Sequence, residues 1–413
     1  MLLRVQIALG IVTLTALAWA PAHGQELAER ETVRMFLTRS PSAQESRAGT
    51  AIVEARTQSW WLWPNPQASY DHEGAGLTQI ARVEQTLPLN GRLGFLRQAG
   101  ASAVRAAGMQ AEYNLWRQCS EMRRAFYDLL LGQERETLLG DSLRQLQEVV
   151  RILRERENLG EGSRFDRLRA EREGSELQAE LVSAQAWTAQ ARSRLVAFLD
   201  SSVDRISIRA RGDFGTAAEL PPLPQLIELA LETRQDYQAE HQQQEQFRWE
   251  ERAADRLRIP NPVFSLGVKR AEGIGGMHYG PYVAFSLPLP VFDRGKALIA
   301  QIEAEMRRSS YRREALDQQI QAEVTGAFEA LRMRRTAAAD YRLRFEEQGS
   351  ELERIAETAY QEGELGILEL LDAYRVHWQS KLRALELSAA SKQAEIDLER
   401  AAGKPVLNPE VLP

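Results

Sequence analysis

The pattern of hydrophobic and polar positions changes twice within each half of the chain. Residues 26–62 carry a helical pattern. Hydrophobic and polar residues then alternate over 67–73 and 79–87, as they do in short strands, and Gly74-Ala75-Gly76 separates the two segments. The first part of the chain is therefore predicted to be a helix followed by a β-hairpin.

A long coiled-coil helix is predicted next, because 94–158 contains no proline and its apolar residues recur at steps of four and three. A glycine-rich tip at 159–163 ends this helix, and a returning helix is predicted over 164–199. The seam of the long helix consists of Leu139, Leu143, Leu146, Val150 and Leu153, and that of the returning helix of Leu177, Leu181, Ala184, Ala191 and Leu195.

The second half repeats the first. Pro64-Asn65-Pro66 is matched by Pro260-Asn261-Pro262, and Leu87-Pro88-Leu89 by Leu287-Pro288-Leu289, in the same order. The repeats are assigned to 26–200 and 223–403, with a glycine- and proline-containing connector at 201–222 and a C-terminal tail at 404–413. The second repeat is predicted to hold a helix at 224–258, strands at 263–270 and 279–289, a long helix at 295–362, a tip at 363–366 and a returning helix at 367–402.

The predicted lengths indicate a rod. A helix of about 65 residues is roughly 100 Å long, and the two shorter helices of each repeat together match it. The strands alternate like those of a membrane barrel, as Phe264, Leu266 and Val268 do with their polar neighbours. Four strands cannot close such a barrel, which needs about 8. Three copies would supply twelve strands, so the chain is expected to assemble with copies of itself.

The N-terminus has the features of a secretory signal peptide, assigned to 1–24. Arg4 precedes an apolar stretch, and the small residues Ala20-Pro21-Ala22 suit a signal peptidase. A retained membrane anchor is the alternative, but the apolar stretch is short and lacks basic residues after it. The protein is expected to act outside the cytoplasm.

Composition excludes several classes of protein. A net charge of −6 argues against nucleic-acid binding. A mean hydropathy of −0.40 excludes a bundle of transmembrane helices. Cys119 is the one cysteine, so no disulfide framework exists. The histidines show no metal-binding spacing, and His72 should point away from its neighbours Asp71 and Glu73 along a strand. We expect no metal site, no cofactor, no catalytic residue and no enzyme activity.

The duplicated unit, with Pro-Asn-Pro before its strands and Leu-Pro-Leu after them, resembles the TolC-type outer membrane factors, and Pro64 to Gly74 is most similar to their CzcC-like metal-cation efflux branch. The resemblance implies a mainly α fold with a transmembrane β-barrel portion, in which a homotrimer forms a twelve-stranded barrel and a coiled-coil periplasmic tunnel. It implies the outer membrane of a Gram-negative bacterium, contact with its lipid, and an exit duct for tripartite efflux or type I secretion. The implied partners are a periplasmic adaptor (membrane fusion protein) and an inner-membrane transporter.

The resemblance also implies roles for individual residues. Glu369 and Asp372, which share a helix face, match the acidic ring that gates the tunnel aperture. Leu365 stands where the family often has a basic residue that latches the closed state, so Asp166 lacks an obvious partner. The tips that contact the adaptor are expected to use Gly160, Asp166, Gly363, Glu364, Leu365 and Leu368, and the membrane-interface aromatics to be Trp60, Trp61 and Trp63.

A second function stays open at this stage. An exported periplasmic coiled-coil protein that binds a partner and forms no pore would share the signal, the heptads and the glycine turns. It would not need two dyad-patterned strand pairs at matching positions of a duplicated rod, and this feature favours the channel.

Overall fold

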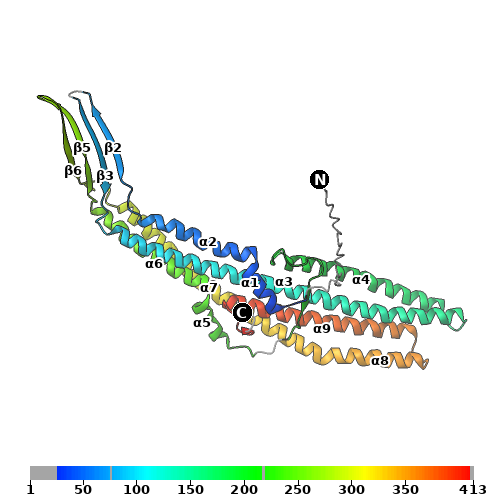
Figure 1. Cartoon of the computed structure of the whole chain (residues 1–413). Helices are drawn as coiled ribbons and strands as arrows, with labels where there is room; N and C mark the ends of the chain where they lie inside the picture. Colours follow the sequence, from blue (N-terminus) through cyan, green and yellow to red (C-terminus); the bar gives the residue numbers. More distant parts are fainter. Residues whose placement is uncertain (1–25, 75–76, 216–218, 410–413) are drawn as a thin grey trace, which may run out of the picture.

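The computed structural model describes residues 26–74, 77–215 and 219–409, so the predicted signal peptide lies outside the described residues. A long helical body carries four strands at one end and two helical hairpins at the other (Figure 1). The two halves of the chain contain the same series of helix, strand pair, long helix and returning helix. The sheet and the hairpin tips are therefore separated by the full length of the body.

The four projecting strands form one antiparallel sheet in the order β2-β3-β5-β6. Strands β2 and β3 come from the first repeat, and β5 and β6 from the second. Their bounds are β2 (Gln67–Glu73), β3 (Thr78–Thr86), β5 (Val263–Gly273) and β6 (Gly276–Ser286). The strands at the two edges of the sheet are β2 and β6.

The register separates the sheet into an apolar and a polar face. Val83 lies opposite Leu266, which lies opposite Val283, so all three share one face. This apolar face also carries Tyr70, Phe264, Val268, Tyr279 and Phe285, and all of these large side chains are exposed. Arg82 lies on the other face, where it forms ion pairs with Asp71 (2.7 Å) and Glu84 (2.7 Å).

The coiled-coil part of the body consists of two hairpins. The first contains α3 (Arg92–Asn158) and α4 (Arg164–Val196). The second contains α7 (Lys296–Tyr341), a π-helical turn η3 (Arg342–Glu346), α8 (Glu347–Gln361) and α9 (Ile367–Ala402). The prediction of an uninterrupted α-helix over 295–362 is therefore wrong at 342–346, where the hydrogen-bonding pattern widens.

The helices that precede the strands are also broken. The predicted helix over 26–62 is divided into β1 (Glu26–Ala28), α1 (Glu29–Arg39), α2 (Pro41–Gln58) and a 3₁₀ turn, η1 (Ser59–Trp61). The break falls at Ser40 (ψ 131°), because a residue before proline disfavours the helical region. The predicted helix over 224–258 is divided into α5 (Leu223–Thr233), α6 (Gln235–Asp255) and η2 (Arg256–Arg258).

A long-range strand pair was not predicted. β1 pairs in parallel with β4 (Arg209–Arg211), which lies in the connector. The pairing fixes the start of the first repeat against the segment that joins the two repeats.

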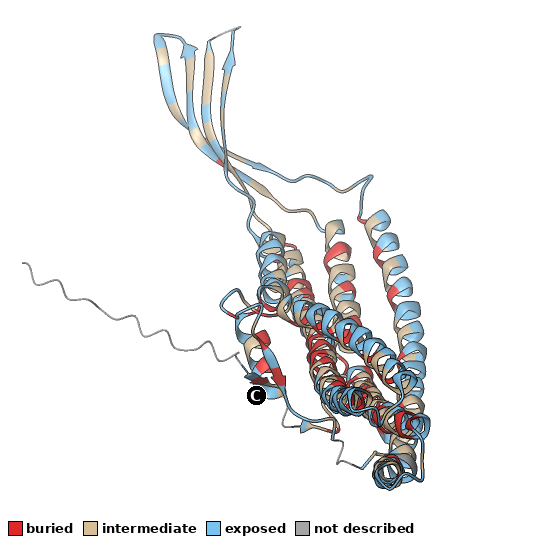
Figure 2. Ribbon diagram, turned by 90° about the vertical axis from the view of Figure 1, so that its right-hand side faces the viewer, coloured by how far each residue is buried: buried red, intermediate tan, exposed pale blue. Residues whose placement is uncertain are grey.

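The core runs along the inside of the helical body, while most of the sheet is exposed (Figure 2). The predicted seam residues Leu139, Leu143, Leu146 and Leu153 are buried in one cluster with Leu177. Helix α9 of the second repeat contributes to the same cluster, so the two hairpins share a core. Across 26–74, 77–215 and 219–409, no helix has both the length and the apolar character needed to cross a bilayer.

Candidate functional site

Both hairpins turn at a glycine in the left-handed region. Gly160 has φ +78° and Gly363 has φ +79°, a conformation that is costly for residues with a Cβ. In each turn an amide hydrogen bonds back to a helix carbonyl: Glu161 N to Arg156 O at 2.9 Å, and Glu364 N to Ala359 O at 2.8 Å. These bonds satisfy carbonyl groups at the helix ends and fix the shape of the two tips.

The tip residues differ in exposure. Leu159, Phe165 and Leu368 are exposed apolar side chains, whereas Leu365 is partly buried against the core shared by the hairpins. Asp166 is partly buried in the first turn of α4 and has no ion-pair partner within the described chain. The two tips therefore present apolar surface together with unpaired acidic charge.

Glu369 and Asp372 lie on one exposed face of α9. Leu370 and Leu371, between them, are buried, which directs the two carboxylates away from the core. Glu369 is in the first turn of the helix, where a carboxylate is favoured by the free amide groups. The structure thus places the predicted acidic pair just after the second tip, at the far end of the body from the sheet.

Arg375 is a residue of this region that the sequence analysis missed. Its guanidinium donates a hydrogen bond to Asp372, and it lies 4.0 Å from Glu173 of α4. The hydrogen bond with Asp372 raises the pKa of Arg375. Arg375 therefore connects the second hairpin to the first. Its spacing of three residues from Asp372 is the signal that could have identified it.

A second polar contact lies inside the second hairpin. His377 Nε2 of α9 is 3.1 Å from a carboxylate oxygen of Glu353 of α8, and both side chains are largely removed from solvent. Tyr374, one turn earlier, donates a hydrogen bond to Glu357. Burial lowers the pKa of His377, and nearby Lys381 acts in the same direction. The packing of α8 on α9 therefore favours the neutral imidazole.

The three tryptophans before β2 are not equivalent. Trp61 packs against α3, and its ring occupies the space beside Gly100, where an added Cβ would lie 2.4 Å from Cζ3. Trp63 is exposed, and Trp60 is partly buried. Of the predicted interface aromatics, Trp63 is thus the one that presents its ring most openly to the surroundings.

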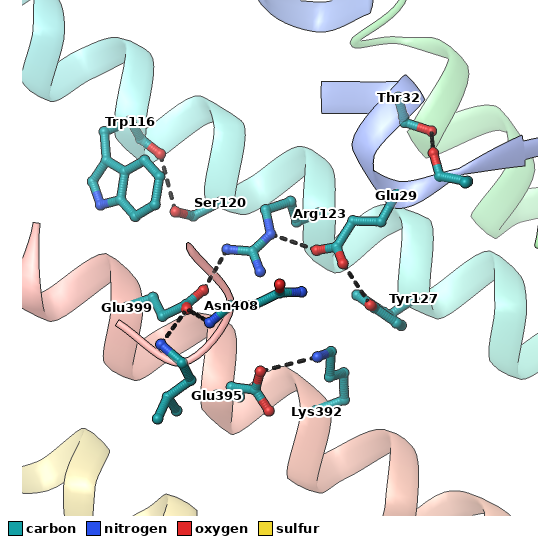
Figure 3. A network of polar contacts seen from close by, with 12 residues as sticks. Glu29, Thr32, Trp116, Ser120, Arg123, Tyr127, Lys392, Glu395, Glu399 and Asn408 are labelled. Carbon is teal, nitrogen blue, oxygen red and sulfur yellow. Dashed lines mark hydrogen bonds and ion pairs between the residues drawn. The ribbon is translucent and has the colours of Figure 1, made fainter. Parts of the chain in front are cut away.

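A buried ionic network, here called the waist network, holds the middle of the body (Figure 3). Arg123 of α3 is fully buried and binds Glu29 of α1 (2.6 Å) and Glu399 of α9 (2.7 Å). Glu399 also accepts hydrogen bonds from the backbone amides of Leu407 and Asn408, each at 3.0 Å. Arg123, Glu29 and Glu399 thereby join α1, α3, α9 and the C-terminal segment.

The described residues offer little for metal chemistry. Asp71 and His72 are on opposite faces of the sheet, and Asp71 is paired with Arg82. No group of three or more His, Cys, Asp or Glu residues that could hold a metal ion occurs among them. Cys119 is buried, and burial raises its pKa to about 12, which keeps the thiol protonated.

A cleft of about 1030 Å³ lies where α3, α7, α9 and the connector meet. Its charged lining includes Glu134, Asp141, Arg335 and Lys381, and its lining contains neither histidine nor cysteine. Histidine, the side chain that most often acts as a general base, is therefore not present in this cleft.

Comparison with known proteins identifies the architecture. No protein-family model matches the chain. It is 23% identical over 361 residues to the cobalt-zinc-cadmium resistance protein CzcC of Cupriavidus metallidurans, covering 86% of this chain and 83% of the relative.

Solved structures give the same result. A membrane protein from Pseudomonas aeruginosa superposes with a TM-score of 0.75 at 20% identity, over 91% of this chain and 92% of the other. The Campylobacter jejuni CmeC outer membrane channel gives a TM-score of 0.74 at 14% identity, over 98% and 95%. The resemblance to the TolC-type outer membrane factors is confirmed, and the fold is that of outer membrane channel proteins.

Proposed function

We propose that three copies of this chain form an outer-membrane channel of a Gram-negative bacterium, the exit duct of a tripartite efflux pump or a type I secretion system. The observation that carries the proposal is the two-faced sheet at one end of a helical body about 100 Å long. An exposed apolar face on a four-stranded sheet requires a nonaqueous neighbour, and lipid is such a neighbour.

The sheet is suited to closure with copies of itself. Its edge strands, β2 and β6, are unpaired within the chain. Antiparallel pairing of β6 of one copy with β2 of the next would give twelve strands in three copies and leave no edge. The apolar face, with Val83, Leu266 and Val283, would contact lipid, and the face with Arg82 would line the lumen.

The helical hairpins are proposed to continue the lumen as a periplasmic tunnel. Their tips are the proposed docking sites for a periplasmic adaptor, supported by the exposed side chains of Leu159, Phe165 and Leu368 around the turns at Gly160 and Gly363. Glu364 is exposed beside them, whereas Leu365 supports the turn from within. Asp166 is available as a charged contact for the adaptor.

The aperture gate is assigned to Glu369 and Asp372. In a threefold assembly these exposed residues would place six carboxylates around the opening, where they would attract cations. Leu365 stands where the family often has the basic residue that latches the closed state. Arg375 is proposed to act as the latch instead, because it bridges the two hairpins.

Metal cations are the proposed cargo, because the relative CzcC is named for cobalt, zinc and cadmium resistance. The chain is proposed to supply a passage and no catalysis, so that transport energy comes from an inner-membrane transporter. Trp63 is proposed to lie at the membrane interface.

The test is single-channel conductance in a planar lipid bilayer. We expect the native protein to give a small cation-selective conductance that divalent cations block. Glu369→Ala combined with Asp372→Ala should enlarge the conductance and weaken the block. Asp141→Ala combined with Glu148→Ala, two exposed acids of α3, is the control and should leave both unchanged.

The outcomes separate the claims. A native conductance that the paired substitutions leave unaltered would keep the channel and remove the gate. Folded trimers that never insert would favour the exported partner-binding coiled coil.

A further inference from the structure

The junction between the sheet and the helical body is strongly basic. Four segments meet there: 56–63, 87–97, 252–260 and 287–296. Together they contain eight Arg or Lys residues and two acidic residues, Asp255 and Asp293, in a chain whose net charge is −6. We call this region the basic collar. Its charge is opposite in sign to that of the chain as a whole.

The collar is also rich in exposed apolar side chains. Trp63 is 59% exposed, and Phe292 is fully exposed. Leu62, Leu89, Leu287 and Leu289 are exposed as well, and they lie in the segments that connect the strands to the helices. These side chains add exposed apolar surface at the base of the sheet, and such a surface requires a nonaqueous neighbour.

Most of the collar's positive charge is not neutralised within the described chain. Asp255 forms the one ion pair of the collar there, with Arg258 at 3.0 Å. Asp293 accepts the amide hydrogen of Gly295 at 2.8 Å. Arg252 lies over the ring of Trp249 at 4.6 Å, which holds its guanidinium in place without cancelling its charge.

Both long helices begin in the collar with a cation. Arg92 and Lys296 are the first residues of α3 and α7, and neither helix has an acidic residue in its first turn. The N-terminus of a helix carries partial positive charge, so a cation there is unfavourable unless an anion is bound. The Nε atom of Arg92 is buried without a hydrogen-bond partner among the described residues.

We propose that the basic collar binds the phosphate groups of anionic phospholipids on the periplasmic side of the membrane. This proposal rests on the proposed function, which puts the sheet in the bilayer and the body in the periplasm. Guanidinium groups bind phosphate through paired, charge-assisted hydrogen bonds. The neighbouring Leu, Phe and Trp side chains would enter the acyl region, as aromatic residues do at membrane interfaces. The collar then fixes the depth at which the channel sits.

The test measures lipid retention by the intact trimer. Protein purified in mild detergent is incubated with dioleoyl-phosphatidylglycerol or with zwitterionic dioleoyl-phosphatidylcholine, and native mass spectrometry counts the bound lipids. We expect several-fold greater retention of phosphatidylglycerol. Arg252→Gln, Arg256→Gln, Arg294→Gln and Lys296→Gln combined should abolish that preference.

The matched control removes four exposed arginines along the helical body: Arg117→Gln, Arg144→Gln, Arg172→Gln and Arg332→Gln. This variant should keep the preference for phosphatidylglycerol. Conductance and circular dichroism of both variants establish that they fold and form channels. Equal retention of the two lipids by the native channel, or equal losses in the two variants, would overturn the collar proposal and leave the channel intact. Failure of the native protein to form a channel would instead contradict the proposed function.

Discussion

Removing the guanidinium of Arg375 should open the channel. Arg375→Gln deletes both the hydrogen bond to Asp372 and the contact with Glu173, which is the ion pair between the two hairpins at this level of the described body. The substitution keeps the aliphatic part of the side chain and a polar end group, and it removes the positive charge. Its main effect is therefore on charge, and the loss of packing is small.

The size of the effect follows from exposure. The side chains of Arg375 and Glu173 are 45% and 24% exposed, so the ion pair between the two hairpins is close to a surface pair. Such a pair contributes about 0.5 kcal/mol, and its three copies in the proposed trimer would contribute about 1.5 kcal/mol. Because about 1.4 kcal/mol is a factor of ten in an equilibrium constant, the open population should rise about tenfold. Higher salt should reduce the difference, since exposed pairs are screened.

The assay is the open probability of single channels in planar bilayers at low and high salt. Arg383→Gln is the matched control, because Arg383 is on the same helix, is similarly exposed and pairs with Glu386 of its own helix. Its open probability should equal that of the native channel. The assignment of Arg375 as a latch is wrong if the Arg375 and Arg383 variants behave alike.

Three further predictions concern stability. Arg123→Met should lower the free energy of unfolding by about 3–5 kcal/mol in denaturant titrations of the detergent-solubilised protein, because it leaves the fully buried Glu399 without its cation. Adding Glu399→Gln should recover part of this loss. Gly363→Ala should cost about 1–2 kcal/mol at φ +79°, whereas Gly326→Ala, at an open helical position, should stabilise by about 0.5–1 kcal/mol in the same titrations. The folded state favours neutral His377, so the free energy of unfolding should be steady above about pH 6.5 and fall below it as the unfolded chain takes up a proton. The measurement is hydrogen exchange in α8 and α9 as a function of pH, and His377→Gln should reduce the loss of protection below about pH 6.5.

Local sequence signals were enough for the repeating elements. Alternation of hydrophobic and polar residues predicted strand β2 over 67–73, and glycines predicted the turns at Gly160 and Gly363. Both signals are local, because hydrophobic periodicity and a residue with positive φ each depend on only a few neighbouring positions. The spacing of Glu369 and Asp372 also predicted that they share a helix face, and their role as a gate stays a prediction.

Features that depend on distant residues were not predicted. The break between α5 and α6 at Arg234 has no proline or glycine to signal it. The buried guanidinium of Arg234 binds Asp236 (2.7 Å) and Glu323 of α7 (2.5 Å). Glu323 is distant in the sequence, so this partner is known only once the helices are packed. The pairing of β1 with β4 likewise joins the start of the first repeat to the connector that follows it. The π-helical turn at 342–346 has no pattern of its own in the sequence.

The waist network has a consequence for the timing of biogenesis. Arg123 and Glu399 are 276 residues apart, and the amide donors of Leu407 and Asn408 come later still. During synthesis and export, α3 emerges long before the partners of its buried arginine. Arg123 must therefore remain hydrated, and the helices at the middle of the body are not yet held together by the waist network. The apolar seams of the helices can pack early, but the waist network is complete only after residue 408 has been exported. Early termination upstream of that point would therefore weaken the centre of the molecule, where the C-terminal segment binds Glu399.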